Sequence, residues 1–179
     1  MYEEWIRHAL KLATKQQHLA SQPDQTDQPN PPERPVQADQ PNQPCQAVPP
    51  SDIPIAALVI DGSGAIIGVG VNTREAQGDP TGHAEINALR AAGLSRGDWH
   101  LEDCTLVATL EPCTMCAGAA VLARVRRIVF AAWDPKAGAC GSIRDVVRDR
   151  RLNHQIEVVG GVLETEARTQ LRDYFNSLR

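Results

Sequence analysis

A stretch of low complexity near the N-terminus sets the strongest limit on how this chain can fold. Residues 21–50 hold nine prolines and seven glutamines, and the tetrapeptide Asp-Gln-Pro-Asn occurs twice among them. Apart from alanine and one cysteine, only two valines offer apolar surface, so burial cannot offset the entropy lost on ordering this segment. We expect residues 21–51 to form a disordered insert. The 20 residues before it are too few to fold alone, so the sequence predicts a single domain over residues 1–179 that the insert interrupts.

The charge of the chain becomes informative only after this insert is set aside. The formal net charge is −4, which disfavours a nucleic-acid partner. Residues 21–52, however, carry five acidic side chains against one arginine, and the remainder of the chain is neutral. Residues 121–154 hold eight basic side chains against three acidic ones. This segment is either a solvated surface or part of an RNA-binding face.

The apolar pattern outside the insert predicts helices and strands that largely alternate. We expect a helix over residues 1–20, a hairpin of strands at 55–60 and 65–71, and a helix from His83 that stops at Gly93. A strand at 105–110 and a helix at 113–125 follow. Two further strands at 128–132 and 156–159 enclose a loop with a short helix between 135 and 150. A last helix carries an apolar stripe of Ala167, Leu171, Tyr174, Phe175 and Leu178. This order predicts an α/β sandwich, a mixed sheet covered by helices.

Two short motifs, each at the start of an expected helix, contain residues suited to bind a metal. The first is His83-Ala84-Glu85 and the second is Pro112-Cys113-Thr114-Met115-Cys116. Together they match the H-x-E and P-C-x-x-C signature of zinc-dependent deaminases. Residues three apart on a helix share one face, so both thiolates can contact one ion. With His83 as the third ligand, the fourth tetrahedral position is left for water, as in a catalytic zinc site.

Other uses of these cysteines are weaker explanations. The five cysteines are an odd number, which argues against a disulfide framework. A redox pair of Cys113 and Cys116 leaves His83 and Glu85 without a purpose. A structural zinc site needs a fourth protein ligand, and none of the candidates repeats a ligand spacing: Cys45, Cys104, Cys140, His100 and His154.

Glu85 is the candidate acid and base. Zinc lowers the pKa of a bound water from about 15.7 to near 7, and a carboxylate beside that water can take its proton. We expect Glu85 to pass this proton to a ring nitrogen and then to protonate the leaving ammonia. The alternative, compatible with the first, is that Glu85 stabilises the first helical turn through the helix dipole.

At these residues the chain resembles the bacterial tRNA-specific adenosine deaminases of the TadA type, within the cytidine deaminase-like superfamily. The likeness lies in residues 79–86, in residues 109–119 and in the loop at 134–142. It covers residues 1–20 and about 52–179, and the insert is a departure from it. The resemblance implies a three-layer α/β/α sandwich with a five-stranded mixed sheet, one Zn²⁺ held by His83, Cys113 and Cys116, and catalysis by Glu85.

The same resemblance implies that Asn72 hydrogen-bonds the substrate base and that the protein is a homodimer. Asn72 is otherwise a residue that caps a turn at a strand end. The implied reaction is hydrolysis of the wobble adenosine of a tRNA anticodon to inosine, with the anticodon stem-loop as the partner. Two alternatives stay open: deamination of a free base or nucleoside of the guanine or cytosine type, and a non-catalytic zinc subunit that binds tRNA.

The sequence gives no sign of export or of a membrane segment. The N-terminal 20 residues read as an amphipathic helix without a cleavage site, and no apolar run approaches the roughly 20 residues that span a bilayer. We therefore expect a cytoplasmic protein with no membrane partner.

Overall fold

The computed structural model describes residues 1–20 and 52–179, and the expected insert lies outside the described residues. A five-stranded sheet in the order β2-β1-β3-β4-β5 forms the middle layer. Its strands are β1 (Ala56–Ile60), β2 (Ile66–Val71), β3 (Thr105–Leu110), β4 (Arg127–Ala132) and β5 (Glu157–Val159). β1 pairs antiparallel with β2 and β3, whereas β3, β4 and β5 run parallel. The expected mixed sheet is confirmed.

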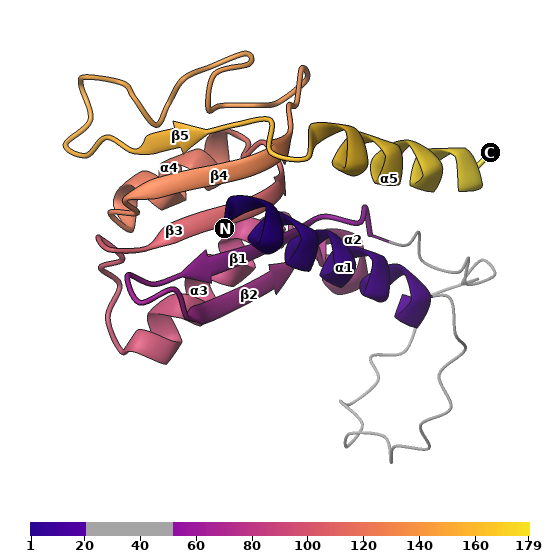
Figure 1. The fold of residues 1–179 in the computed structure, drawn as a ribbon, viewed down its shortest axis with the longest axis horizontal. Coiled ribbons are helices and arrows are strands. Elements are labelled where there is room, and N and C mark those ends of the chain that lie inside the picture. The colour runs from indigo at the N-terminus through magenta and orange to yellow at the C-terminus, as the bar shows by residue number, and fades with distance from the viewer. Residues whose placement is uncertain (21–51) are drawn as a thin grey trace, which may run out of the picture.

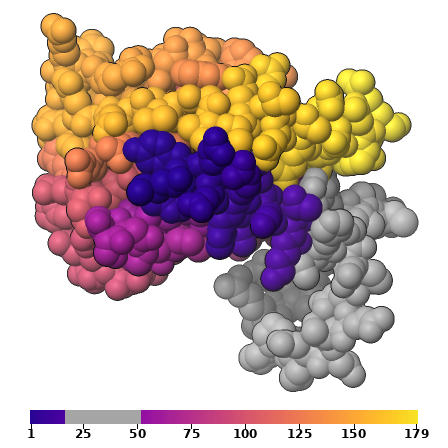
Figure 2. Space-filling model, viewed as in Figure 1, coloured from indigo at the N-terminus to yellow at the C-terminus, as the bar shows by residue number. Residues whose placement is uncertain are grey.

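Helices cover both faces of this sheet, which makes three layers (Figure 1). One face carries α1 (Tyr2–Ala20) and α5 (Glu164–Ser177), whose surfaces adjoin in Figure 2. The Gln170 side chain donates to Leu10 O at 3.1 Å and so links these two helices. The opposite face carries α3 (Ala84–Arg96) and α4 (Thr114–Leu122). The α/β/α sandwich inferred from the sequence is therefore the observed fold.

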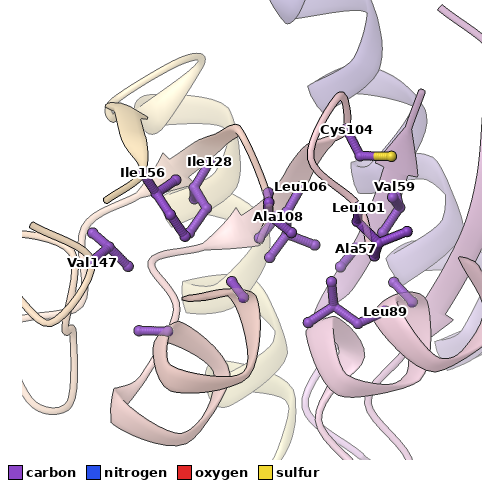
Figure 3. Packing of buried hydrophobic residues seen from close by; sticks show 14 of the residues in the cluster. Ala57, Val59, Leu89, Leu101, Cys104, Leu106, Ala108, Ile128, Val147 and Ile156 are labelled. Carbon is purple, nitrogen blue, oxygen red and sulfur yellow. The ribbon is translucent and has the colours of Figure 1, made fainter. Parts of the chain in front are cut away.

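Each face of the sheet has its own apolar core. Ile6, Ala9 and Ala13 of α1 are fully buried at three- and four-residue spacing, as their periodicity predicts. On the other face, side chains of β1, β3 and β4 pack with Leu89 and with Ile156 (Figure 3). All five residues of β1 are buried, because this strand lies between two others and beneath helices on both sides.

Close packing between α3 and β2 depends on two glycines of the strand. A Cβ atom at Gly70 would lie 2.1 Å from Ala84 O, and one at Gly68 would lie 2.3 Å from Ala88 O. No residue with a side chain fits at these positions without moving the helix. The backbone of α3, which begins at the candidate site, is therefore fixed directly against the edge strand.

Three sequence expectations about helices need correction. The helix from residue 84 does not stop at Gly93 but continues to Arg96, because Gly97 adopts the left-handed conformation (φ 69°) and its N–H bonds Gly93 O and Leu94 O. No helix forms between residues 135 and 150, where the loop is organised by a buried carboxylate described below. A short helix, α2 (Arg74–Gln77), was not expected.

The apolar stripe of the last helix is only partly buried. Ala167 and Tyr174 pack inward, whereas Phe175 and Leu178 remain 47% and 59% exposed. α5 runs past the ends of the strands, so its last turns have less of the sheet to cover (Figure 1). Among the described residues, no helix is long and apolar enough to cross a membrane.

Candidate metal centre and active site

Three side chains from two helix N-termini converge in one place. His83 precedes α3 as its N-cap, Cys113 precedes α4 as its N-cap, and Cys116 lies in the first turn of α4. The Nδ1 atom of His83 lies 3.6 Å from each sulfur, and the two sulfurs lie 3.7 Å apart. The structure therefore brings together the three residues that the sequence motifs predicted as ligands.

These separations match the edges of a tetrahedral zinc site. With Zn–S bonds of about 2.3 Å and a Zn–N bond of about 2.05 Å, tetrahedral angles give an S–S edge of about 3.8 Å and an S–N edge of about 3.6 Å. The observed distances of 3.7 and 3.6 Å agree with both values. His83 Nδ1, Cys113 Sγ and Cys116 Sγ would thus hold a zinc ion without rearrangement.

The close approach of the two thiols disfavours ionisation of both. Hydrogen bonds from Cys116 and His83 lower the pKa of Cys113 to about 4. The neighbouring Cys113 sulfur and burial raise the pKa of Cys116 instead. One anion is therefore stabilised and the second is suppressed, and a divalent ion compensates both negative charges. The donor set thus favours a bound metal on chemical as well as geometric grounds.

No fourth protein ligand completes this cluster among the described residues. Cys104 is buried near the opposite end of β3, where its sulfur lies 3.2 Å from Arg96 Nη1. Cys140 is fully buried outside the cluster, and burial raises its pKa to about 12. His100 contacts Asp98, and His154 contacts the carbonyl of Val125. Three ligands with an open position are typical of catalytic zinc.

Glu85 lies beside the cluster in the first turn of α3. The side chain is only 4% exposed, and burial raises its pKa to about 7. A carboxyl group with a pKa near neutrality can both accept and donate a proton at physiological pH. The arrangement suits acid–base chemistry next to the metal position.

Asn72 follows the last residue of β2 and faces the same cavity. It is 7% exposed, and its Nδ2 donates to Ile53 O at 3.3 Å. Its Oδ1 atom is buried and has no hydrogen-bond partner among the residues that the structure describes. An amide oxygen in this position can accept a hydrogen bond from a group bound in the cavity.

A cavity of about 280 Å³ joins these groups. Asn72, His83, Glu85 and Cys113 line it, and Leu110 and Ile55 add apolar wall. A volume of this size accommodates a single heterocyclic base and excludes a folded polymer. The cavity therefore admits one extruded nucleotide or a free base.

Glu111 is the residue that the sequence reasoning missed. It is 2% exposed and accepts hydrogen bonds from the backbone amides of Asp134, Cys140 and Ser142, each at 3.0 Å. One carboxylate thus holds the loop after β4 against the cavity, in place of the expected short helix. The available signal was an acidic residue between an apolar strand and a proline, in a position where burial is expected.

Comparisons with known proteins agree with this geometry. The model of the cytidine and deoxycytidylate deaminase zinc-binding region matches residues 40–132. The tRNA-specific adenosine deaminase of Bacillus subtilis is 44% identical over 128 residues, which are 72% of this chain and 79% of that protein. A tRNA(Ile)-lysidine synthase of Deinococcus deserti is 49% identical over 128 residues, and the chain spans about a quarter of its length (24%).

Solved structures give the same fold. One from a study of A-to-I editing by tRNA:A34 deaminases at the wobble position is 28% identical, with a TM-score of 0.71 over 93% of this chain and 98% of that one. A guanine deaminase of Nitrosomonas europaea, 23% identical with a TM-score of 0.69 over 96% and 83% of the two chains, shares the fold.

The sheet, the two helix N-termini and the three-ligand cluster define a zinc-dependent deaminase. The chain belongs to the zinc-binding cytidine and deoxycytidylate deaminase family, and within it to the tRNA-specific adenosine deaminases. Zinc is accordingly the cofactor of this site, and the chain has the ligands to hold it.

Proposed function

We propose that this protein hydrolyses the wobble adenosine of a tRNA anticodon to inosine and ammonia. The observation that carries the proposal is the placement of Glu85 beside the three-ligand cluster, in a cavity with room for one base. The 44% identity to the Bacillus subtilis adenosine deaminase supports the choice of substrate. We also propose that residues 1–179 act as one deaminase domain interrupted at 21–51.

The chemistry divides between the metal and the protein. A bound zinc ion supplies a water molecule that is ionised near neutral pH and therefore nucleophilic. Glu85 accepts one proton from the attacking water and delivers it to the ring nitrogen of the base. It then accepts the second proton from the hydroxyl that has been added to the ring carbon and delivers it to the departing amine, while the ring carbonyl forms. Its raised pKa suits both directions of this transfer. Water is consumed, ammonia leaves, and the ring carbonyl of inosine remains.

Asn72 is the proposed contact to the base. Its Oδ1 lacks a partner within the described protein, and its amide faces the cavity that Glu85 and His83 also line. An amide that accepts a hydrogen bond from the purine orients the ring, so that the reacting carbon lies next to the metal position.

The cationic stretch at residues 121–154 supports an RNA partner. Arg127, Arg148 and Arg151 form ion pairs with nearby carboxylates. The other exposed cations of the stretch make no ion pair with any described residue: Arg126, Lys136, Arg144 and Arg150. Four unpaired cations on one stretch of chain favour contact with a phosphate backbone.

We further propose that the protein acts as a homodimer in the cytoplasm, where its tRNA substrate is found. The dimer follows from the resemblance to the adenosine deaminase family. Light scattering on the purified protein tests it, and a single monomer mass at micromolar concentration contradicts it.

One set of incubations tests the function. Purified zinc-loaded protein is mixed with an anticodon stem-loop whose wobble base is adenosine, and separately with adenine, guanine, cytosine and cytidine. We expect inosine and ammonia from the stem-loop only. Turnover of a free base alone moves the assignment to a small-molecule deaminase, and zinc binding without any turnover indicates a non-catalytic subunit. A stem-loop with guanosine at the wobble position is the matched control.

A further inference from the structure

One side chain joins the helix that carries the catalytic groups to the wall that carries Asn72. Asn87 lies on α3, one turn beyond His83, and its backbone N–H donates to His83 O at 3.0 Å. Its side-chain Nδ2 donates to Val71 O at 2.9 Å and to Thr73 Oγ1 at 3.1 Å. These two acceptors are the chain neighbours of Asn72 on either side.

The carbonyl of Val71 depends on this donor because of where it lies. Val71 is the last residue of β2, which is an edge strand of the sheet. The N–H of the next residue, Asn72, already points to β1 and donates to Ile55 O, so Val71 O points away from the sheet. Asn87 therefore holds the end of β2 through a hydrogen bond to a carbonyl that no neighbouring strand of the sheet can pair.

A second link ties the same segment to the residue before the histidine ligand. The N–H of Thr73 donates to Gly82 O at 2.8 Å. The segment around Asn72 is thus bonded to the chain on both sides of His83 and Glu85. The wall around Asn72 is thus tied to the chain that carries His83 and Glu85, and these bonds set the separation between the Asn72 amide and His83.

The orientation of Asn87 is itself determined. Its Oδ1 accepts a hydrogen bond from Arg90 Nη1 at 3.3 Å. The NH₂ group is thereby directed at Val71 and Thr73. A leucine at this position keeps a similar volume but donates no hydrogen bond.

We propose that Asn87 is a positioning residue for substrate binding, which acts through Asn72 by holding the end of β2 against α3. The inference rests on the proposed function, because it requires that Asn72 contacts the base. Asn87 does not itself line the cavity. Its removal leaves the zinc ligands and Glu85 in place and lets the Asn72 amide drift.

The test is a double-mutant cycle on zinc-loaded protein with the adenosine stem-loop as substrate. The variants are Asn72→Ala, Asn87→Leu, the combination of both, and Ser95→Ala as the matched control at an exposed position of the same helix. We expect Asn87→Leu to raise KM by about tenfold, the cost of a lost hydrogen-bond contact to substrate, with kcat within about twofold and zinc content unchanged. In the Asn72→Ala background the same change adds less than about twofold, because its route of action is already removed. Ser95→Ala should stay near wild type.

The outcomes separate this inference from the function it rests on. A wild-type protein that forms no inosine from the stem-loop overturns the function. If the wild type is active, three results overturn only the inference. The first is an unchanged KM in Asn87→Leu, and the second is loss of zinc from that variant. The third is a double variant whose KM rises by the full product of the two single effects. If Asn87→Leu does not fold, Thr73→Val decides, because it removes one acceptor and leaves the bond to Val71. It should raise KM by about two- to fivefold, and an unchanged KM contradicts the proposal.

Discussion

Two hollows on this protein differ in size and in chemistry. The larger, of about 720 Å³, lies at the C-terminal ends of α3 and α4 and is lined by the exposed side chains of Leu94, Trp99 and Leu122. The smaller, of about 280 Å³, lies at the N-terminal ends of the same helices and contains buried polar groups. Burying Glu85 and an unpartnered Asn72 oxygen is costly, and the larger hollow carries no such cost. Chemistry therefore belongs to the smaller one.

The same two helices explain the contrast. Their N-termini present unpaired N–H groups and partial positive charge, which stabilise thiolates and a carboxylate. Both N-caps, His83 and Cys113, are metal ligands. The C-terminal ends of α3 and α4 are capped by Gly97 and Ala123. The residues that line the larger hollow there include no buried titratable side chain.

The largest expected effect comes from removing a ligand in the smaller hollow. Cys116→Ala should abolish zinc binding and inosine formation, because two protein ligands do not hold the ion in tetrahedral geometry. Metal analysis and the stem-loop assay measure both. Cys104→Ala is the matched control, since this thiol is equally buried but outside the cluster, and it should retain one zinc per chain. Full zinc content in Cys116→Ala contradicts the assignment.

Next in size is the loss of proton transfer. Glu85→Gln keeps the shape of the side chain and removes its acid–base function, so kcat should fall by about 10²- to 10⁴-fold while zinc stays bound. Single-turnover rates on the stem-loop measure the change. A rate within threefold of wild type would show that another group moves the proton.

The raised pKa of Glu85 also predicts a pH effect on stability in the metal-stripped protein. Its folded pKa of about 7 lies above the usual 4.5, so the folded state holds the proton more tightly. This contribution is complete below about pH 4.5 and is lost as the pH rises to about 7, up to about 3 kcal/mol. Glu85→Gln removes that loss, so its stability relative to wild type should increase from pH 5 to pH 8. Urea unfolding at pH 5 and pH 8 measures the free energy of unfolding of both proteins. If the difference between Glu85→Gln and wild type is the same at the two pH values, the raised pKa of Glu85 does not contribute to stability.

A smaller effect is expected from the carboxylate that organises the wall of the smaller hollow. Glu111→Gln replaces one accepting oxygen by an NH₂ group that faces backbone donors, and the buried N–H groups lose a partner. We expect a loss of about 1 to 3 kcal/mol in the free energy of unfolding. Urea unfolding measures it, with Glu102→Gln on the exposed surface as the control. An unchanged free energy of unfolding would mean that the loop at 134–142 keeps its conformation without the Glu111 carboxylate.

The smallest effect belongs to the larger hollow. Trp99→Ser removes the largest side chain of its lining, which is 59% exposed and lies in the wall of the larger hollow, away from the groups around the metal. The kcat of inosine formation should change by less than about twofold. A large loss of kcat with zinc still bound would erase the distinction between the two hollows.

The sequence predicted the strands and the metal ligands better than it predicted the loops. The strands at 105–110 and around 128–132 and the ligands His83, Cys113 and Cys116 follow from local pattern, because periodicity and ligand spacing are properties of short segments. The loop after β4 was misjudged, since its shape depends on Glu111, more than 20 residues earlier in the chain. The end of α3 at Gly97 was missed because Gly93 is also a glycine that can end a helix, and local sequence does not distinguish the two.

The catalytic role of Glu85 and the substrate contact of Asn72 stay predictions. The sequence motif placed Glu85 beside the metal, and the family resemblance implied that Asn72 contacts the base. The structure gives Glu85 a buried position and Asn72 an oxygen without a partner among the described residues. The link through Asn87 had no sequence signal at all, because its two acceptors are a backbone carbonyl and a hydroxyl on another element. Only the close approach of α3 to β2 brings them within reach.

Zinc titration of the metal-stripped protein, with inosine formation from the stem-loop followed at each step, bears most directly on the catalytic site. The rate should rise in proportion to added zinc and level off at one equivalent per chain, and Cys116→Ala should show no rise. Full activity in protein shown to be free of metal, or a rise that continues well past one equivalent, would contradict a single catalytic ion held by His83, Cys113 and Cys116.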